Sequence, residues 1–185
     1  MIDPNQPSEW RNDVKVMFSA DELQTRIAAL AQTISAEYPA GTELCVVGIL
    51  KGSVPFLADL IRHVELPLHL EFMGISSYGD DTKSSGVVQI TSDLTKSIEG
   101  KDVLIVEDIV DTGLTIQYLK DNLSSRRPNS LKICTLLDKP SGRKCEVDVD
   151  FTGFEIPDAF VIGYGLDFAG KFRNLPFIGT YHGPV

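Results

Sequence analysis

Residues 103–115 read VLIVEDIVDTGLT, and this stretch decides which fold the chain adopts. Its first part, residues 103–108, shows no alternation and begins with four apolar residues, which predicts a central strand in a sheet that is covered on both faces. A short Thr/Gly/Thr loop follows, and residues 114–123 are predicted to form a helix. Strands that alternate with helices in this way indicate an α/β fold with a mostly parallel sheet.

Further elements are predicted on both sides of this stretch. The sequence SADE at 19–22 is a capping-box pattern, and the apolar residues after it recur at helical spacing, so a helix is expected over 20–37. A buried strand is expected at 44–50 and a helix at 54–64. Other strands are expected at 69–73, 87–91, 131–137 and 160–165, and a polar, mobile loop at 76–86.

Composition narrows the class of protein. The chain has 185 residues, of which 43% are hydrophobic and 23% charged, as in one ordinary globular domain. Its formal net charge of −9 argues against nucleic-acid or anionic-membrane partners, because both need a basic surface. The longest apolar stretches are about seven residues, whereas a membrane-spanning helix needs about 20. We therefore expect a single domain over residues 1–185, without a membrane or nucleic-acid partner.

The cysteines and the N-terminal residues bear on the compartment. Cys45, Cys134 and Cys145 show no CxxC spacing, so they are expected to be free thiols, which suits a reducing cytoplasm. The first ten residues, MIDPNQPSEW, are polar and do not read as a signal peptide. We therefore expect a cytoplasmic protein.

The candidate chemistry lies where the predicted strands end, because ligands of parallel sheets bind beyond the carboxyl ends of the strands. In the loop from Asp111 to Thr115, backbone N–H groups and two hydroxyls are suited to hold an anion at a helix N-terminus, although an ordinary N-capped turn has the same pattern. Glu107 and Asp108 end a buried strand, where bare charge is costly. They could reach solvent or pair with Lys or Arg, or they could bind ribose hydroxyls and Mg²⁺. A phosphate loop beside two acids fits a ribose 5-phosphate.

These segments resemble a known family. VLIVEDIVDTGLT is similar to the PRPP-binding signature of type I phosphoribosyltransferases. The closer likeness is to bacterial hypoxanthine (hypoxanthine-guanine) phosphoribosyltransferases, and it extends over roughly residues 44–180. It is carried by GILKGS at 48–53, SSYG at 76–79, ICTLLDKPS at 133–141 and IPDAFVIGYGLDFAGKFRNLPFIG at 156–179. The resemblance implies the type I phosphoribosyltransferase fold: a mostly parallel twisted sheet flanked by helices, with a core at about 40–165 and a small hood built from N- and C-terminal segments.

The resemblance also implies a reaction in purine salvage. The 5-phosphoribosyl group of PRPP would pass to hypoxanthine and to guanine, giving IMP or GMP plus pyrophosphate, with Mg²⁺ as cofactor. Its oxocarbenium-like transition state requires a positioned base, a stabilised pyrophosphate and control of a purine proton. A preference for xanthine or guanine stays open, as does a regulator that keeps the fold and binds RNA or protein. The family forms homodimers or homotetramers, so we expect a homo-oligomer.

Site roles follow from the resemblance residue by residue. Asp111 matches the general base or acid at purine N7, with a helix N-cap as its alternative. The 5′-phosphate loop corresponds to Asp108, Thr112, Gly113, Leu114 and Thr115, and some relatives carry Lys in place of Leu114. Glu107 and Asp108 match the ribose-binding acids, and with Asp167 they match the metal ligands.

The remaining matches lie around the pyrophosphate and the purine. Lys51, Gly52 and Arg173 match pyrophosphate contacts, and the Leu50–Lys51 peptide bond is cis in some members. The purine contacts are Lys139, Phe160, Val161 and Asp167, and a loop that closes over the site carries Ser77 and Tyr78. Ordinary alternatives are a solvated loop for Lys51, a surface turn for Lys139, a core strand for Phe160 and a surface ion pair for Arg173.

Overall fold

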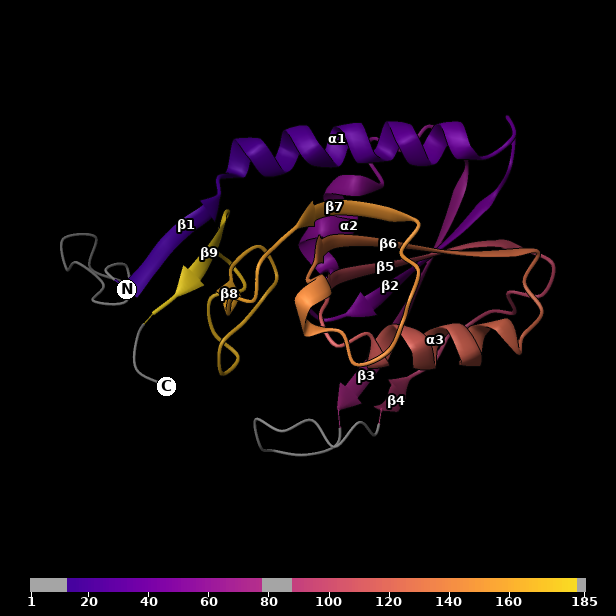
Figure 1. Cartoon of the computed structure of the whole chain (residues 1–185). Helices are drawn as coiled ribbons and strands as arrows, with labels where there is room; N and C mark the ends of the chain where they lie inside the picture. The colour runs from indigo at the N-terminus through magenta and orange to yellow at the C-terminus, as the bar shows by residue number, and fades with distance from the viewer. Residues whose placement is uncertain (1–12, 78–87, 183–185) are drawn as a thin grey trace, which may run out of the picture.

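The computed structural model describes residues 13–77 and 88–182 of the chain. A six-stranded sheet runs through its centre in the order β4-β3-β2-β5-β6-β7 (Figure 1). Its strands are β2 (Leu44–Leu50), β3 (Leu68–Ser77), β4 (Val88–Ser92), β5 (Asp102–Val110), β6 (Ser130–Asp138) and β7 (Phe151–Glu155). All neighbours in this sheet pair in parallel except β3 and β4, which are antiparallel. The predicted mixed α/β class with a mostly parallel sheet is therefore confirmed.

Strand β5 lies between two apolar layers, as its sequence predicts. Leu104 and Val106 are buried in a core that includes helices α1 (Ala20–Glu37) and α2 (Val54–Leu60). Val103 and Ile105 point to the other face and pack in a second core with helix α3 (Leu114–Ser124). Figure 1 shows α1 and α2 on one side of the sheet and α3 on the other. Because successive strand residues face opposite layers, a strand covered on both sides is apolar throughout.

Two predicted elements end earlier than expected. The helix predicted over 54–64 ends at Leu60, where hydrogen bonds from Arg62 to Asp59 and from His63 to Leu60 tighten the chain into turns. The strand predicted over 160–165 was also wrong in length, because only β8 (Val161–Ile162) is extended. Gly163, Tyr164 and Gly165 follow it with φ of 94°, 48° and 101°, and such a run of positive φ values is incompatible with a strand.

A second sheet joins the two ends of the described chain. It has three strands in the order β1-β9-β8, where β1 is Val14–Phe18 and β9 is Ile178–Tyr181. In Figure 1 this sheet lies beside the main sheet at one end of the molecule. It is the small hood, built from N- and C-terminal segments, that the fold prediction includes.

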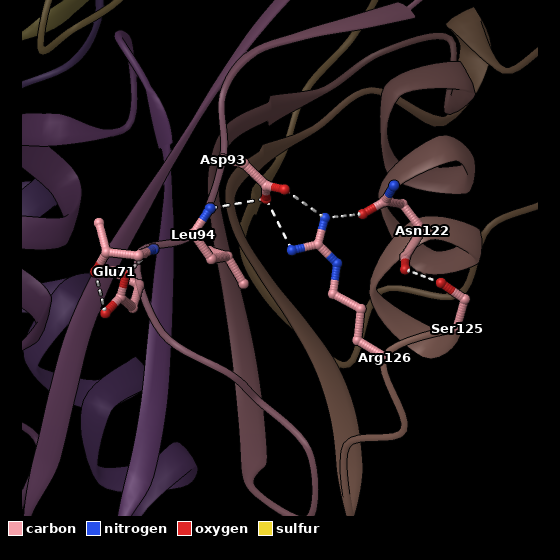
Figure 2. Close-up of polar contacts among 7 residues, drawn as sticks. Glu71, Asp93, Leu94, Asn122, Ser125 and Arg126 are labelled. Atoms are coloured by element: carbon pink, nitrogen blue, oxygen red, sulfur yellow. Dashed lines mark hydrogen bonds and ion pairs between the residues drawn. The ribbon is translucent and has the colours of Figure 1, made fainter.

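A polar network holds the segment that follows β4 at the edge of the main sheet. Arg126 donates hydrogen bonds of 2.8 and 3.0 Å to the two carboxylate oxygens of Asp93, and one of 2.7 Å to Asn122 on α3 (Figure 2). Nearby, Thr95 donates from its backbone N–H to the Glu71 carboxylate on β3 over 2.9 Å. The segment after β4 is thereby tied both to α3 and to β3.

Two expectations from composition can be compared with the structure. All three cysteines are free thiols, and Cys45 and Cys134 are buried, as predicted. Over residues 13–77 and 88–182, none of the helices combines the length and the apolar composition needed to cross a membrane.

Candidate active site

The site begins where β5 passes into α3. Gly113 is the residue before the helix, and its φ of 82° is a conformation that favours glycine. A Cβ at Gly113 would lie 3.1 Å from the carbonyl oxygen and from Sγ of Cys145, so a larger residue would also be tightly packed. Gly113 has no side chain to cap α3, and among the described residues the first N–H of the helix, of Leu114, makes only a long hydrogen bond of 3.4 Å to Thr112 Oγ1. Because this bond is long and the N-cap is a glycine, an anion can bind at the N–H groups of the first turn.

Asp111 lies just before this turn and faces a lysine instead of capping the helix. Its Oδ2 atom is 3.2 Å from Nζ of Lys139, and Nζ is also 2.8 Å from Oδ1 of Asp158. Burial acts to lower the pKa of Lys139, but hydrogen bonds to Asp158 and Asp111 outweigh it and leave the pKa raised. Lys139 is therefore a buried, charged donor, and the N-cap alternative for Asp111 does not apply.

Glu107 and Asp108 lie inside β5, which continues to Val110 and not only to residue 108 as predicted. Glu107 is buried, and its Oε2 atom has no hydrogen-bond partner among the described residues. Burial raises the pKa of Glu107 well above its ordinary value, and the neighbouring Asp108 carboxyl raises it further. Burial also raises the pKa of Asp108, against hydrogen bonds and the nearby Arg173 charge that lower it. This pair fits a site that binds hydroxyls or a cation better than it fits a solvated sheet edge.

The loop after β2 touches this acidic pair. A Cβ at Gly52 would lie 1.5 Å from Oδ2 of Asp108, so a larger residue would displace this carboxylate. A Cβ at Gly165 would in turn lie 1.9 Å from the carbonyl oxygen of Gly52. The Leu50–Lys51 peptide bond is cis, as in some members of the family that the sequence resembles, and Lys51 is exposed.

Two cavities meet beside these residues and share Asp167. The smaller, about 280 Å³, is lined by Asp108, Ile109, Asp111, Lys139, Ala159, Phe160, Val161, Leu166 and Asp167. The larger, about 570 Å³, is lined by Leu50, Lys51, Gly74, Ile75, Ser76, Thr91, Ser92, Asp167 and Arg173. Eight residues singled out in the sequence line these two neighbouring spaces: Lys51, Asp108, Asp111, Lys139, Phe160, Val161, Asp167 and Arg173. Gly52, Glu107 and the loop 112–115 line neither cavity.

At the boundary of the cavities, Asp167 and Arg173 hold each other. Oδ1 of Asp167 is 2.6 Å from Nη2 of Arg173, and Nη1 of Arg173 donates to the Gly165 carbonyl over 2.7 Å. Arg173 therefore forms an ion pair, as in the alternative interpretation from the sequence. The pair lines the larger cavity, however, and does not lie on open surface.

Phe160 presents an aromatic face to the smaller cavity. Its ring is edge-on to Phe168, with 5.7 Å between centroids, and the residue is 54% exposed. The alternative of a plain core residue is therefore wrong for Phe160, whereas Val161 beside it is buried in β8. An exposed aromatic ring at a cavity wall is suited to stack on a planar ligand.

A divalent cation fits this site only together with a ligand. Among the residues that the structure describes, no group of three or more His, Cys, Asp or Glu side chains could hold a metal ion. Asp108 and Asp167 nevertheless line the same cavity, and Glu107 keeps a partnerless carboxylate oxygen. Mg²⁺ is commonly bound by one or two carboxylates plus substrate phosphates and water, so this donor set is compatible with it.

Some predicted residues were not brought into the site, and others were missed. Ser77 is the last residue of β3, and Tyr78 and residues 79–86 lie outside the described part of the chain, so the expected closing loop stays a prediction. Sequence reasoning missed Asp158, the second partner of Lys139, and Gly165, which packs on Gly52. The IPDAF and GYG segments contain both residues, but a pattern of letters does not show which atoms they contact.

Comparisons with known proteins agree on one family. Residues 19–169 match the family described as phosphoribosyl transferase domain. The chain is 52% identical to a hypoxanthine-guanine phosphoribosyltransferase of Bacillus subtilis, with 90% of this chain and 92% of that protein covered. It is 49% identical to the protein of the same name from Mycobacterium avium, over 97% of this chain and 92% of that protein. A crystal structure of a Staphylococcus aureus hypoxanthine phosphoribosyltransferase superimposes with a TM-score of 0.89 at 46% identity, covering 95% of this chain and 96% of the other.

Proposed function

The chain belongs to the phosphoribosyltransferase family, and on this premise we propose that it transfers the 5-phosphoribosyl group of PRPP to hypoxanthine and guanine. The products would be IMP or GMP and pyrophosphate, as expected of a purine-salvage enzyme. The observation that carries the proposal is the cavity of about 280 Å³. Asp108 from the ribose-binding pair lines it together with the purine-facing Asp111, Lys139 and Phe160. Sugar and base would thus meet in one space.

The PRPP side of the site is assigned from the loop before α3. The N–H groups and hydroxyls from Thr112 to Thr115 would bind the 5′-phosphate, and Leu114 would take part only through its backbone. Glu107 and Asp108 would accept hydrogen bonds from the ribose hydroxyls. Lys51, Gly52 and Arg173 would bind the pyrophosphate, since Lys51 and Arg173 line the larger cavity and Gly52 contacts Asp108.

The purine side of the site is assigned from Lys139 and Phe160. Phe160 would stack on the base, and the backbone of Val161 would contact its edge. An ammonium group has three N–H donors, so Lys139 can keep Asp111 and Asp158 and still donate to a 6-oxo group. The 6-amino group of adenine would oppose donor with donor, which gives discrimination against adenine.

Asp111 would manage the purine proton. It borders the base cavity, and its side chain is 44% exposed, so it is accessible to a proton on N7 of a bound base. As N9 attacks the anomeric carbon and pyrophosphate departs, positive charge grows on the sugar and on the base. Removal of the N7 proton by Asp111 relieves the charge on the base.

Several further parts of the proposal rest on the family. Mg²⁺, when bound, would neutralise charge on the pyrophosphate, and Glu107, Asp108 and Asp167 are the residues that would hold it. Ser77 and Tyr78 would belong to a segment that covers the site and excludes water. The chain would act as a single domain, with the six-stranded sheet as core, in a cytoplasmic homodimer or homotetramer.

The direct test is a spectrophotometric assay with PRPP and Mg²⁺ against hypoxanthine, guanine, xanthine, adenine and uracil in parallel. We expect turnover of hypoxanthine and guanine, none of adenine or uracil, and loss of activity with EDTA. Turnover of xanthine above the other two would change the substrate assignment. Binding of PRPP without turnover of any base would contradict the enzyme and favour a regulator on the same fold.

A further inference from the structure

One largely buried arginine, Arg143, which the proposed reaction does not use, contacts the loop before α3 on the side of the segment 143–145. Nη1 of Arg143 donates hydrogen bonds of 2.6 Å to the carbonyl oxygens of both Val110 and Asp111. Its Nη2 atom pairs with the Asp138 carboxylate at the end of β6. The Arg143 side chain is only 18% exposed, so these bonds are largely shielded from water. A guanidinium in this position joins the end of β6 to the turn between β5 and α3.

The next carbonyl of the loop is held from the same side. The backbone N–H of Lys144 donates to the Thr112 carbonyl over 2.9 Å, and the Cys145 thiol lies 3.7 Å from the same oxygen. Three successive carbonyls, of residues 110, 111 and 112, are therefore bound by the segment 143–145. Because these three contacts come from one segment, they give the loop a defined orientation.

The orientation of these carbonyls fixes the orientation of the N–H groups. In a planar trans peptide the C=O of one residue and the N–H of the next point in opposite directions. Carbonyls that are held toward Arg143 and Lys144 therefore turn the N–H groups of Asp111, Thr112 and Gly113 away from this segment. Successive N–H groups that point to one side form a concavity that binds anions.

From this geometry we propose that Arg143 is a positioning residue for phosphoribosyl transfer. It presets the N–H groups of the loop for the 5′-phosphate and keeps Asp111 beside Lys139. The inference rests on the proposed function for the identity of the anion. Without Arg143 the loop samples other peptide orientations, and the apparent affinity for PRPP falls in proportion to the competent fraction.

The chain contains a matched control for this test. Arg26 on α1 also donates to two backbone carbonyls, of Gly153 over 2.6 Å from Nε and of Thr152 over 2.6 Å from Nη2. It fastens α1 to β7 and lines neither of the two cavities of the site. R26Q and R143Q thus remove the same kind of contact, in one case from a structural strand and in the other from the phosphate loop.

The experiment compares wild type, R143Q, R143K and R26Q by thermal denaturation, steady-state kinetics and calorimetric titration with PRPP. We expect both glutamine variants to lower Tm, but only R143Q to raise KM and Kd for PRPP by about tenfold or more. KM for the purine should change less than about threefold, because Lys139 and Phe160 are untouched. R143K should be intermediate, because it restores the charge but not the forked geometry.

The outcomes separate this role from the proposed function. Wild-type protein that binds PRPP without transferring it contradicts the proposed function, and the Kd comparison then still tests Arg143. Equal PRPP affinity in wild type and R143Q, or an equal loss in R26Q, overturns the positioning role. If R143Q does not fold, R143K carries the comparison, and an unchanged KM for PRPP in R143K would contradict the proposal.

Discussion

Helices α1 and α3 begin in opposite ways. At α1, Ser19 and Glu22 form a complete capping box, in which the Glu22 N–H donates to Ser19 Oγ and the Ser19 N–H donates to Glu22 Oε2. At α3 the equivalent position is Gly113 at positive φ, which has no side chain to cap the turn, and the Leu114 N–H makes only a 3.4 Å hydrogen bond to Thr112 Oγ1. The first turn of α1 contains two acidic residues, whereas that of α3 contains none.

This difference shows two uses for the same unsatisfied backbone groups. The first N–H groups of every helix lack partners within the helix. At α1 the chain itself satisfies one of them, because the Glu22 N–H donates to the Ser19 side chain, and this contributes to stability. At α3 a capping side chain would compete with a bound anion, and an acid in the first turn would repel it. We infer that α3 forgoes capping stability so that its N-terminus can bind phosphate.

The largest effect should come from Asp111, which precedes α3 without capping it. D111N is expected to lower kcat by about 10²–10⁴-fold, because the variant cannot take the N7 proton. Its Tm should stay near that of wild type, because no cap is lost. D21N, at the exposed start of α1, is the control and should leave kcat unchanged. Normal turnover in D111N would remove the assigned role.

The next effect concerns the lysine that holds Asp111 away from the helix. K139A should raise KM for hypoxanthine by about 10–100-fold, the effect of losing a charged hydrogen bond of about 1.5–3 kcal/mol. The change in KM for PRPP should be smaller, because the loop backbone is held by other contacts. Steady-state kinetics with each substrate varied in turn measures both values, and equal weakening would mean that Lys139 does not face the base.

Gly113 tests whether the turn before α3 depends on its backbone conformation. G113A should lower stability by about 1–2 kcal/mol, because a Cβ at φ of 82° is strained, and it should raise KM for PRPP. Gly41 has nearly the same φ of 84° but open space around it, so G41A carries the strain alone. A KM for PRPP that is equal in the two variants would place the phosphate elsewhere.

At α1, removal of the cap should affect stability alone. S19A is expected to cost about 1 kcal/mol. For a chain of this length that corresponds to a decrease in Tm of about 2–4 °C. The kinetic constants should remain those of wild type. Loss of activity in S19A at unchanged protein concentration would show that the two helix starts are coupled.

The smallest effect is in the pH dependence of the two regions. The hydrogen bond from the Ser19 side chain lowers the pKa of Glu22 below its ordinary value of 4.5. The ionised Glu22 carboxylate therefore stabilises the fold fully above pH 4.5, and this stabilisation is lost as the pH falls below that value and Glu22 becomes protonated. Burial raises the pKa of Glu107, so its contribution becomes less favourable as the pH rises above 4.5. In thermal denaturation, the difference in Tm between wild type and S19A should become smaller toward acid pH. The Tm of E107Q should increase relative to that of wild type as the pH rises. The opposite slopes would contradict these pKa directions.

The sequence predicted those helices and strands whose boundaries are marked by neighbouring residues, and it missed strands that form by pairing with a distant segment. The boundaries of α1 and β2 were predicted correctly, and those of β5 and α3 nearly so, because a cap, an apolar periodicity or an unbroken apolar run marks each of them. Strands β1, β7 and β9 were missed. They are short, and β1 exists only through pairing with β9, as between Val14 and Tyr181. No local signal records such a distant partner.

The same limit applies to the site. The residues alone indicated an anion loop beside two buried acids, and resemblance to a family added Lys139, Phe160 and Arg173. The contacts of Asp158 with Lys139 and of Arg143 with backbone carbonyls were not predictable. Such contacts depend on the path of the segment after β6. Because every residue has a backbone carbonyl, the sequence does not show which carbonyls accept a hydrogen bond from a side chain.

The most direct test of the difference between the two helix starts is a crystal structure of the protein with GMP bound. We predict that the phosphate oxygens lie within hydrogen-bond distance of the N–H groups of Thr112 to Thr115, with the purine against Phe160 and its 6-oxo group on Lys139. The capped start of α1 should be unchanged. A phosphate bound at Lys51 and Arg173 with the first turn of α3 unoccupied would contradict the account.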